Sequence, residues 1–142
     1  MTSPFQTAID WQPRLACEDD IAALEALIPV SVRTLQAAYY SAAQIEKALG
    51  SFFGIDGQLI RDGTYFVVEH GAKIIGCGGW SKRRSLYGGD GHRVEADAEL
   101  DPRRDAARIR AFFVHPTWAR RGIGRSIMTA CERAIVESGY RA

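Results

Sequence analysis

The chain opens with a region in which apolar residues follow helical spacing. Between Ile21 and Ile28 the apolar positions fall on one face of a helix. Glu18–Asp20 precede them, and acidic side chains favour the first turn because a helix N-terminus carries partial positive charge. Pro29 lacks the N–H donor that a helix interior needs, so we predict that it ends or kinks this helix.

A second helix is predicted from its capping residues. Ser41 and Gln44 have the spacing of a capping box, in which each side chain satisfies the backbone N–H of the other. This helix should run through Leu49 and stop at Gly50.

Segments rich in β-branched and aromatic residues predict four strands. These segments are Trp11–Ala16, Thr64–Glu69, Lys73–Trp80 and Ile109–Val114. His70 and Gly71 form a turn that joins the second and third strands as a hairpin. Pro13 suits an edge strand or a bulge, because proline cannot donate to a strand ladder.

A third, longer helix is predicted from Gly122 to about Ser138, and Gly139 supplies its C-terminal stop. Its apolar face consists of Ile123, Ile127, Cys131, Ala134 and Ile135. Residues 81–108 are polar and charged, which predicts a long loop. Tyr140–Ala142 have the character of the start of another strand.

Composition indicates one soluble globular domain over residues 1–142, with 46% hydrophobic and 25% charged residues. No apolar run approaches the roughly 20 residues of a membrane-spanning helix, and the N-terminus lacks the features of a signal peptide. Cys17, Cys77 and Cys131 fit neither a disulfide framework nor a zinc site, which favours reduced, buried thiols in the cytoplasm.

Charge is unevenly distributed along the chain. Residues 1–80 hold 5 basic and 9 acidic side chains, a balance of −4, whereas residues 81–125 hold 11 and 6, a balance of +5. The net charge of +1 argues against nucleic acid as the partner, which usually requires a strongly basic domain. A small anionic ligand is the favoured interpretation, and solvated surface arginines are the alternative.

The segment from Phe112 to Ser126, FFVHPTWARRGIGRS, reads as a strand, a tight loop and the start of a helix. Backbone N–H groups at a helix N-terminus lack intrahelical partners and attract anions. Gly122 and Gly124 have no Cβ to keep an anion away, and Arg121 and Arg125 add fixed charge suited to phosphate. Ile123 and the N–H or hydroxyl of Ser126 complete the predicted phosphate-binding loop.

The order of elements, with this loop after a strand that ends in Val114-His115-Pro116, resembles the GCN5-related N-acetyltransferase (GNAT) superfamily. The glycine-rich segment Gly76–Trp80 is similar to the third strand of that family. Arg14, Ala16 and Asp20 resemble the start of its first helix. The family loop usually has Gln or Arg three residues before its first glycine, and Ala119 stands there in this chain.

The resemblance implies a mixed α+β fold, with a largely antiparallel central sheet and helices on both faces. It also implies that acetyl-CoA is the cosubstrate, that no metal is required and that an amine acceptor attacks the thioester directly. Backbone groups near Phe113 and Val114 would bind the pantetheine arm, and a backbone N–H there would polarise the thioester carbonyl. The elements that complete the acceptor side in the family are expected to be lacking here. Either the chain is a shortened form or fragment, or the sheet is completed by a partner chain or by strand exchange, as in a homodimer.

Catalytic residues remain unassigned from the sequence. The candidate bases are Glu69, His92, Glu95 and Glu99, and Tyr39 and Tyr40 are candidates for closing the acceptor site. His115 more simply precedes a proline than serves in catalysis. Two functions stay open, an N-acetyltransferase for a small amine and a non-catalytic CoA-binding or assembly module.

Overall fold

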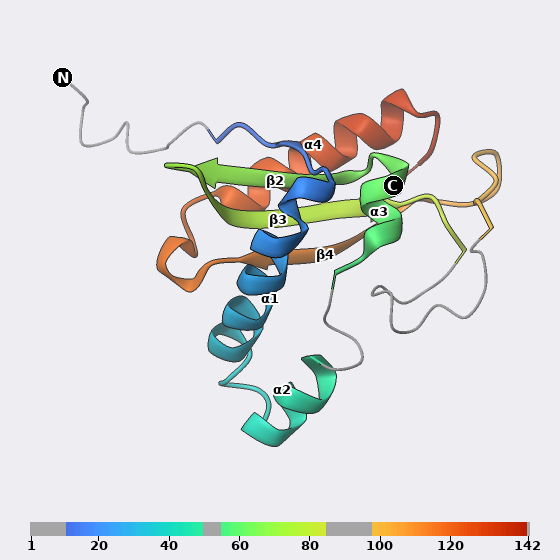
Figure 1. The fold of residues 1–142 in the computed structure, drawn as a ribbon. Helices are drawn as coiled ribbons and strands as arrows, with labels where there is room; N and C mark the ends of the chain where they lie inside the picture. Colours follow the sequence, from blue (N-terminus) through green and yellow to red (C-terminus); the bar gives the residue numbers. More distant parts are fainter. Residues whose placement is uncertain (1–10, 50–54, 85–97, 142) are drawn as a thin grey trace.

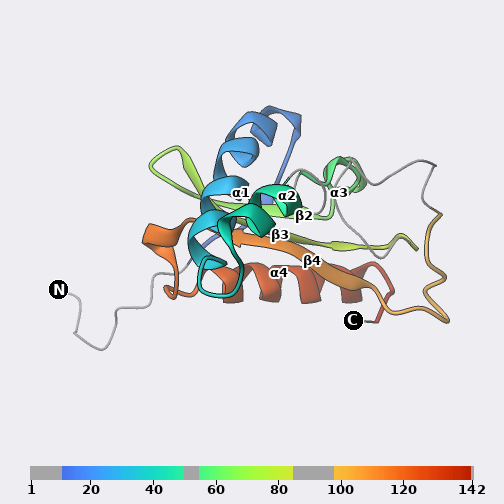
Figure 2. The same cartoon turned by 90° about the horizontal axis from the view of Figure 1, so that it is seen from below.

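A computed structural model describes residues 11–49, 55–84 and 98–141. Four antiparallel strands form one sheet in the order β1 (Arg14–Leu15), β2 (Tyr65–His70), β3 (Lys73–Ser81) and β4 (Arg108–Val114). The helices are α1 (Ile21–Leu35), α2 (Ala42–Leu49), α3 (Gly57–Asp62) and α4 (Ile123–Glu137). Helix α4 covers one face of the sheet, and α1, α2 and α3 lie on the other (Figures 1 and 2). The expected mixed fold with helices on both faces is confirmed.

Each face of the sheet has its own apolar core. On the α4 side, Ile123, Ile127, Cys131 and Ile135 pack with Val68 and Ile75 of the sheet, as the periodicity of this helix predicts. On the α1 side, the buried residues include Leu24 and Leu27 of α1 with Val67 and Cys77. Figure 2 shows the sheet between these two helices, and β4 contacts both α1 and α4.

Pro29 lies inside the first helix, so the prediction that it ends the helix is wrong, whereas a kink at Pro29 stays a prediction. Helix α1 continues to Leu35, because the apolar stripe extends past the proline and keeps Ser31 and Val32 buried. Tertiary packing of such a stripe outweighs the one backbone bond that a proline removes. The capping box is confirmed: Ser41 N–H donates to Gln44 Oε1 at 2.9 Å, and Gln44 N–H donates to Ser41 Oγ at 3.1 Å.

The structure differs from the prediction in three segments. The first strand is shorter than Trp11–Ala16, since only Arg14 and Leu15 pair with β2. The short helix α3 was not predicted; it ends at Gly63, whose φ of 70° lies in the left-handed region that suits glycine. The ends of the expected loop 81–108 also pair, because Arg83 and Glu99 form an antiparallel bridge. Residues 85–97 lie outside the described part of the chain.

The chain returns to β4 after α4. Gly139 has a φ of 86° at the end of the helix, as predicted for a glycine stop. Arg141 then forms a parallel bridge with Ala106, and Ala107 N–H donates to the Arg141 carbonyl at 2.6 Å. The residues that were expected to begin a further strand therefore lie beside the start of β4.

Two of the three cysteines are buried in the cores. Cys77 and Cys131 are fully buried, and burial raises the pKa of each thiol to about 12. Cys17 is exposed, so the expectation that all three are buried is wrong for this residue. Across the described residues, no helix is long and apolar enough to cross a membrane.

The start of α1 is fixed by a charged cluster. The Arg14 guanidinium donates to both carboxylate oxygens of Asp20, at 2.8 and 2.9 Å, and Cys17 N–H donates to the same carboxylate at 2.8 Å. Glu69 of β2 also pairs with Arg14. The hydrogen-bonded guanidinium of Arg14 lowers the pKa of Asp20 from 3.8 to about 2.

We expect Asp20→Asn to lower the free energy of unfolding by about 2 kcal/mol at neutral pH, as loss of a charged hydrogen-bonded pair does. Because the folded-state pKa of Asp20 is depressed, its contribution is present above pH 4 and is lost as the pH falls through about 2. Urea unfolding of both proteins from pH 7 down to pH 2 tests this. A stability difference that stays constant over that range would contradict the assignment.

Candidate functional site

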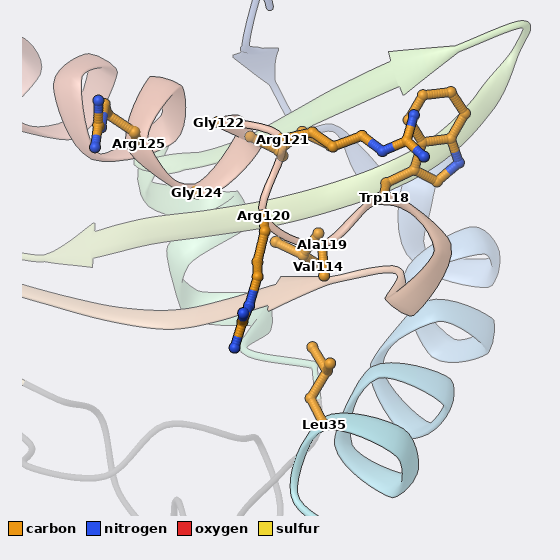
Figure 3. A pocket seen from close by; sticks show the side chains of 10 residues that line it. Leu35, Val114, Trp118, Ala119, Arg120, Arg121, Gly122, Gly124 and Arg125 are labelled. Carbon is orange, nitrogen blue, oxygen red and sulfur yellow. The ribbon is translucent and has the colours of Figure 1, made fainter.

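A cavity of about 850 Å³ opens where β4 ends and α4 begins. Most of its wall belongs to the predicted phosphate-binding loop, and one residue comes from the C-terminal end of α1 (Figure 3). The lining residues are Leu35, Val114, Trp118, Ala119, Arg120, Arg121, Gly122, Ile123, Gly124 and Arg125. The structure thus gathers every predicted cofactor-binding residue except Phe113 and Ser126 around one space.

The first turn of α4 presents backbone N–H groups to this cavity. Gly122 is the N-cap residue, with a φ of 88°, and offers no side chain to cap the helix. The first intrahelical bond there is donated by Ser126 N–H to the Gly122 carbonyl, at 3.0 Å. The N–H groups of Ile123, Gly124 and Arg125 therefore precede the intrahelical ladder, and all three residues line the cavity.

Gly124 keeps this wall of the cavity open. Apart from the neighbouring backbone of its own helix, a Cβ at Gly124 would meet no described atom within 4 Å, so the space beside it is open. A negatively charged group can approach such N–H groups closely, and the helix dipole favours it.

Two arginines of the loop, Arg120 and Arg121, adopt different positions. Arg120 has a φ of 61°, and its side chain extends across β4 toward Leu35 (Figure 3). The Arg121 guanidinium instead lies over the Trp118 ring, 5.1 Å from its centroid. Within the described part of the chain, neither forms an ion pair with a carboxylate. Arg120 was not among the predicted contacts, although its strained backbone and free charge fit an anion site.

Two tryptophans, Trp11 and Trp118, contact the loop and each other. The Trp11 indole N–H donates to the Arg121 carbonyl at 2.9 Å, and Trp11 packs edge-on against Trp118 with ring centroids 5.7 Å apart. His70 of the hairpin turn lies 4.5 Å from the Trp118 ring. Because C=O and N–H point in opposite directions in a trans peptide, the bond to Trp11 turns the Gly122 N–H away from Trp11.

Both hydrogen-bond donors of Ser126 are engaged within α4. Its N–H bonds the Gly122 carbonyl, and its hydroxyl donates to the Ile123 carbonyl at 2.7 Å. A direct contact between Ser126 and a phosphate would therefore require its hydroxyl to leave Ile123.

Strand β4 contains a bulge opposite Gly78. Cys77 pairs with Phe113 and Gly79 pairs with Arg110, so Gly78 faces two residues of β4. Ala111 within the bulge has a φ of 62°, and its carbonyl accepts a hydrogen bond from the buried Tyr65 hydroxyl at 2.8 Å. Gly78 makes room for the bulge, since a Cβ there would lie 2.6 Å from the Phe112 ring.

The two phenylalanines contact opposite faces of the sheet, as strand alternation predicts. Phe112 packs against the α4 core, and Phe113 packs against the α1 side. Phe113 pairs with Cys77 of β3, two residues before the His115 N–H that bonds the Ile75 carbonyl, so the Phe113 N–H faces β3. The Val114 N–H points the other way and donates to Ser31 Oγ of α1 at 3.2 Å. Ser31 was missed in the sequence, although it is a polar residue within a buried apolar stripe.

The candidate bases are held in ion pairs or lie outside the described residues. Glu69 pairs with Arg14 on the side of the sheet away from β4, and Glu99 pairs with Lys82 at 3.2 Å. His92 and Glu95 lie outside the described residues. The His115 side chain accepts a hydrogen bond from Thr117 N–H and caps a short 3-10 helix, Pro116–Trp118. Tyr39 and Tyr40 are exposed.

The part of the chain that the structure describes contains no cluster of three or more His, Cys, Asp or Glu side chains able to hold a metal ion. The chemistry of the cavity is thus that of main-chain donors and guanidinium groups. It suits a phosphorylated organic ligand.

Comparison with known proteins agrees with this fold. The model of the acetyltransferase (GNAT) family matches residues 30–142, and the chain belongs to this family. No curated protein matches the sequence. The predicted phosphate-binding loop lies within the range that the family model matches.

Solved acetyltransferases share the fold at low sequence identity. The PaiA N-acetyltransferase of Thermoplasma acidophilum, in complex with coenzyme A, superimposes with a TM-score of 0.66 at 13% identity, over 92% of this chain and 75% of its own. A GNAT family acetyltransferase of Brucella melitensis, in complex with acetyl-CoA, gives 0.59 at 15% identity, over 92% and 71%. AAC(6')-Iy in complex with a bisubstrate analogue, CoA-S-monomethyl-acetylneamine, gives 0.54 at 14% identity, over 94% and 76%.

Proposed function

We propose that this protein transfers an acetyl group from acetyl-CoA to an amine. The observation that carries the proposal is the start of α4, where three backbone N–H groups, an open Gly124 and the Arg120 side chain, which has no ion-pair partner among the described residues, surround one cavity. The complexes of structural neighbours with CoA, acetyl-CoA and a CoA-linked analogue support it.

The diphosphate of the cofactor would bind to the N–H groups of Ile123, Gly124 and Arg125. Arg120 adds charge from across the cavity, and Arg125 adds it from α4. The pantetheine arm would follow the outer edge of β4, where the Val114 N–H points away from β3. Backbone groups of a strand edge can bind an extended ligand as an added strand would be bound.

The transfer would proceed by direct attack on the bound thioester. The amine nitrogen bonds to the carbonyl carbon, the C–S bond breaks, and the electron pair leaves with the CoA sulfur. The nitrogen loses one proton and the thiolate gains one. A backbone N–H of β4 directed at the carbonyl oxygen would stabilise the charge that develops there. No enzyme nucleophile takes part, which agrees with the raised pKa of Cys77 and Cys131.

The proposal is tested by calorimetric titration with CoA and acetyl-CoA, followed by a thiol-release assay with a panel of amines. We expect micromolar binding and CoA release with at least one amine. Absence of binding at high micromolar cofactor would refute the proposal. Binding without turnover of any amine would favour the alternative, a non-catalytic CoA-binding module.

The two loop arginines should differ in their effect on CoA binding. Arg120→Ala should weaken binding about 10- to 100-fold, since one charge-assisted contact contributes roughly 1.5–3 kcal/mol. Arg121→Ala should have a smaller effect because its guanidinium lies on Trp118. Arg133→Ala, an exposed position on α4, serves as the control and should leave the affinity unchanged. A larger loss for Arg121→Ala than for Arg120→Ala would contradict this placement.

A further inference from the structure

Helix α1 carries one polar side chain within its buried stripe. Leu24, Leu27, Ile28 and Val32 are buried apolar residues on this face, and Ser31 lies among them with 3% of its surface exposed. A buried hydroxyl in such a setting normally has a hydrogen-bond partner. Its partner is the Val114 N–H of β4, which is 83 residues away in the sequence.

The Val114 N–H lies on the outer edge of β4. His115 N–H donates to the Ile75 carbonyl of β3 at 2.8 Å, and successive N–H groups of a strand point to opposite edges. The Val114 N–H therefore points away from β3, and Val114 also lines the cavity of the phosphate loop. Ser31 Oγ, 3.2 Å from the Val114 nitrogen, occupies the position that a ligand oxygen would take at this amide.

From this geometry we infer that Ser31 acts as a placeholder, meaning that its hydroxyl occupies the hydrogen-bonding position of the cofactor in the free protein. Its hydroxyl oxygen satisfies the Val114 N–H in the free protein, and a carbonyl oxygen of the pantetheine arm replaces it on binding. The inference rests on the proposed function, because it needs an extended ligand along β4. When the ligand replaces Ser31 at the Val114 N–H, the Ser31 hydroxyl can turn and donate to the carbonyl of Leu27 one turn earlier, a common bond for serine inside a helix.

The exchange has opposite consequences for stability and affinity. Without the hydroxyl, the Val114 N–H is left without its acceptor in the free protein, which lowers stability. The ligand then no longer competes with Ser31 for that amide, so binding of the arm becomes tighter. A purely structural serine would lower stability without improving affinity.

We would measure binding of CoA and of adenosine 3′-phosphate 5′-diphosphate, which keeps the phosphates but lacks the arm, to Ser31→Ala and to the unaltered protein. Ser31→Ala should bind CoA about five- to tenfold more tightly, bind the arm-less nucleotide unchanged, and melt at a lower temperature. Thr34→Ala, which removes an exposed hydroxyl from the same helix, should change none of these. If Ser31→Ala does not fold, Ser31→Cys keeps the size of the side chain with a weaker acceptor and should shift CoA affinity in the same direction.

Unchanged or weaker CoA binding by the folded Ser31 variant would overturn the placeholder role, as would equal tightening of the arm-less nucleotide. Failure of the unaltered protein to bind CoA would instead refute the proposed function. The two failures are therefore distinguishable within one experiment.

Discussion

Gly124→Val is expected to weaken CoA binding by about 100-fold, which corresponds to about 2.7 kcal/mol. Apart from the neighbouring backbone of its own helix, a Cβ at Gly124 would meet no described atom within 4 Å, so the added methyl groups would project into the cavity. They would occupy the space through which a diphosphate reaches the N–H groups of the first turn. Titration calorimetry with CoA measures the effect.

Gly124→Ala is the matched control because it adds one carbon at the same position. It should weaken binding much less than valine does, and both variants should retain the helical circular dichroism of the parent. A folded Gly124→Val protein with unchanged affinity would show that the cofactor diphosphate binds elsewhere.

Asp56→Ala is expected to destabilise the fold by about 3–5 kcal/mol, as breakage of a buried ion pair does. The Asp56 side chain is fully buried, and its carboxylate accepts a hydrogen bond from the Arg110 guanidinium of β4 at 2.8 Å. The Arg110 side chain is only 12% exposed, so it would be left as a buried charge without this partner. Chemical denaturation gives the free energy of unfolding of each variant.

Two further variants separate the ion pair from a general loss of packing. Glu46→Ala removes a carboxylate from the exposed pair with Arg33 and should hardly change the denaturation midpoint. Asp56→Ala combined with Arg110→Met should be more stable than Asp56→Ala alone, because the buried charge is gone. If the double variant is less stable than the single one, the buried charge is not the cause.

The elements that the sequence predicts well are those specified by local patterns. Helix α4 has an unbroken apolar period, a glycine before it and a glycine after it, and its bounds fall within one residue or two of the prediction. The capping box at Ser41 involves residues three apart, and the hairpin turn predicted at His70-Gly71 lies one residue later, at Gly71-Ala72, because His70 still pairs with Lys73. Pro29 misled the prediction because the packing of α1 on the sheet outweighs a local signal.

The site was predicted in part for the same reason. Glycines and arginines that follow a strand indicate an anion-binding loop without any long-range information. The contacts that shape this loop join distant segments: Trp11 bonds the carbonyl of Arg121, 110 residues away, and Ser31 bonds Val114. The Arg121 guanidinium lies over the Trp118 ring, and no pattern in the sequence carries that information.

The bulge in β4 also affects how copies of this protein meet. Among the described residues β4 is the last strand of the sheet, and a flat edge of this kind invites edge-to-edge aggregation. Ala111, whose φ is 62°, interrupts the regular ladder of this strand. The bulge therefore discourages uncontrolled association of this edge with another sheet.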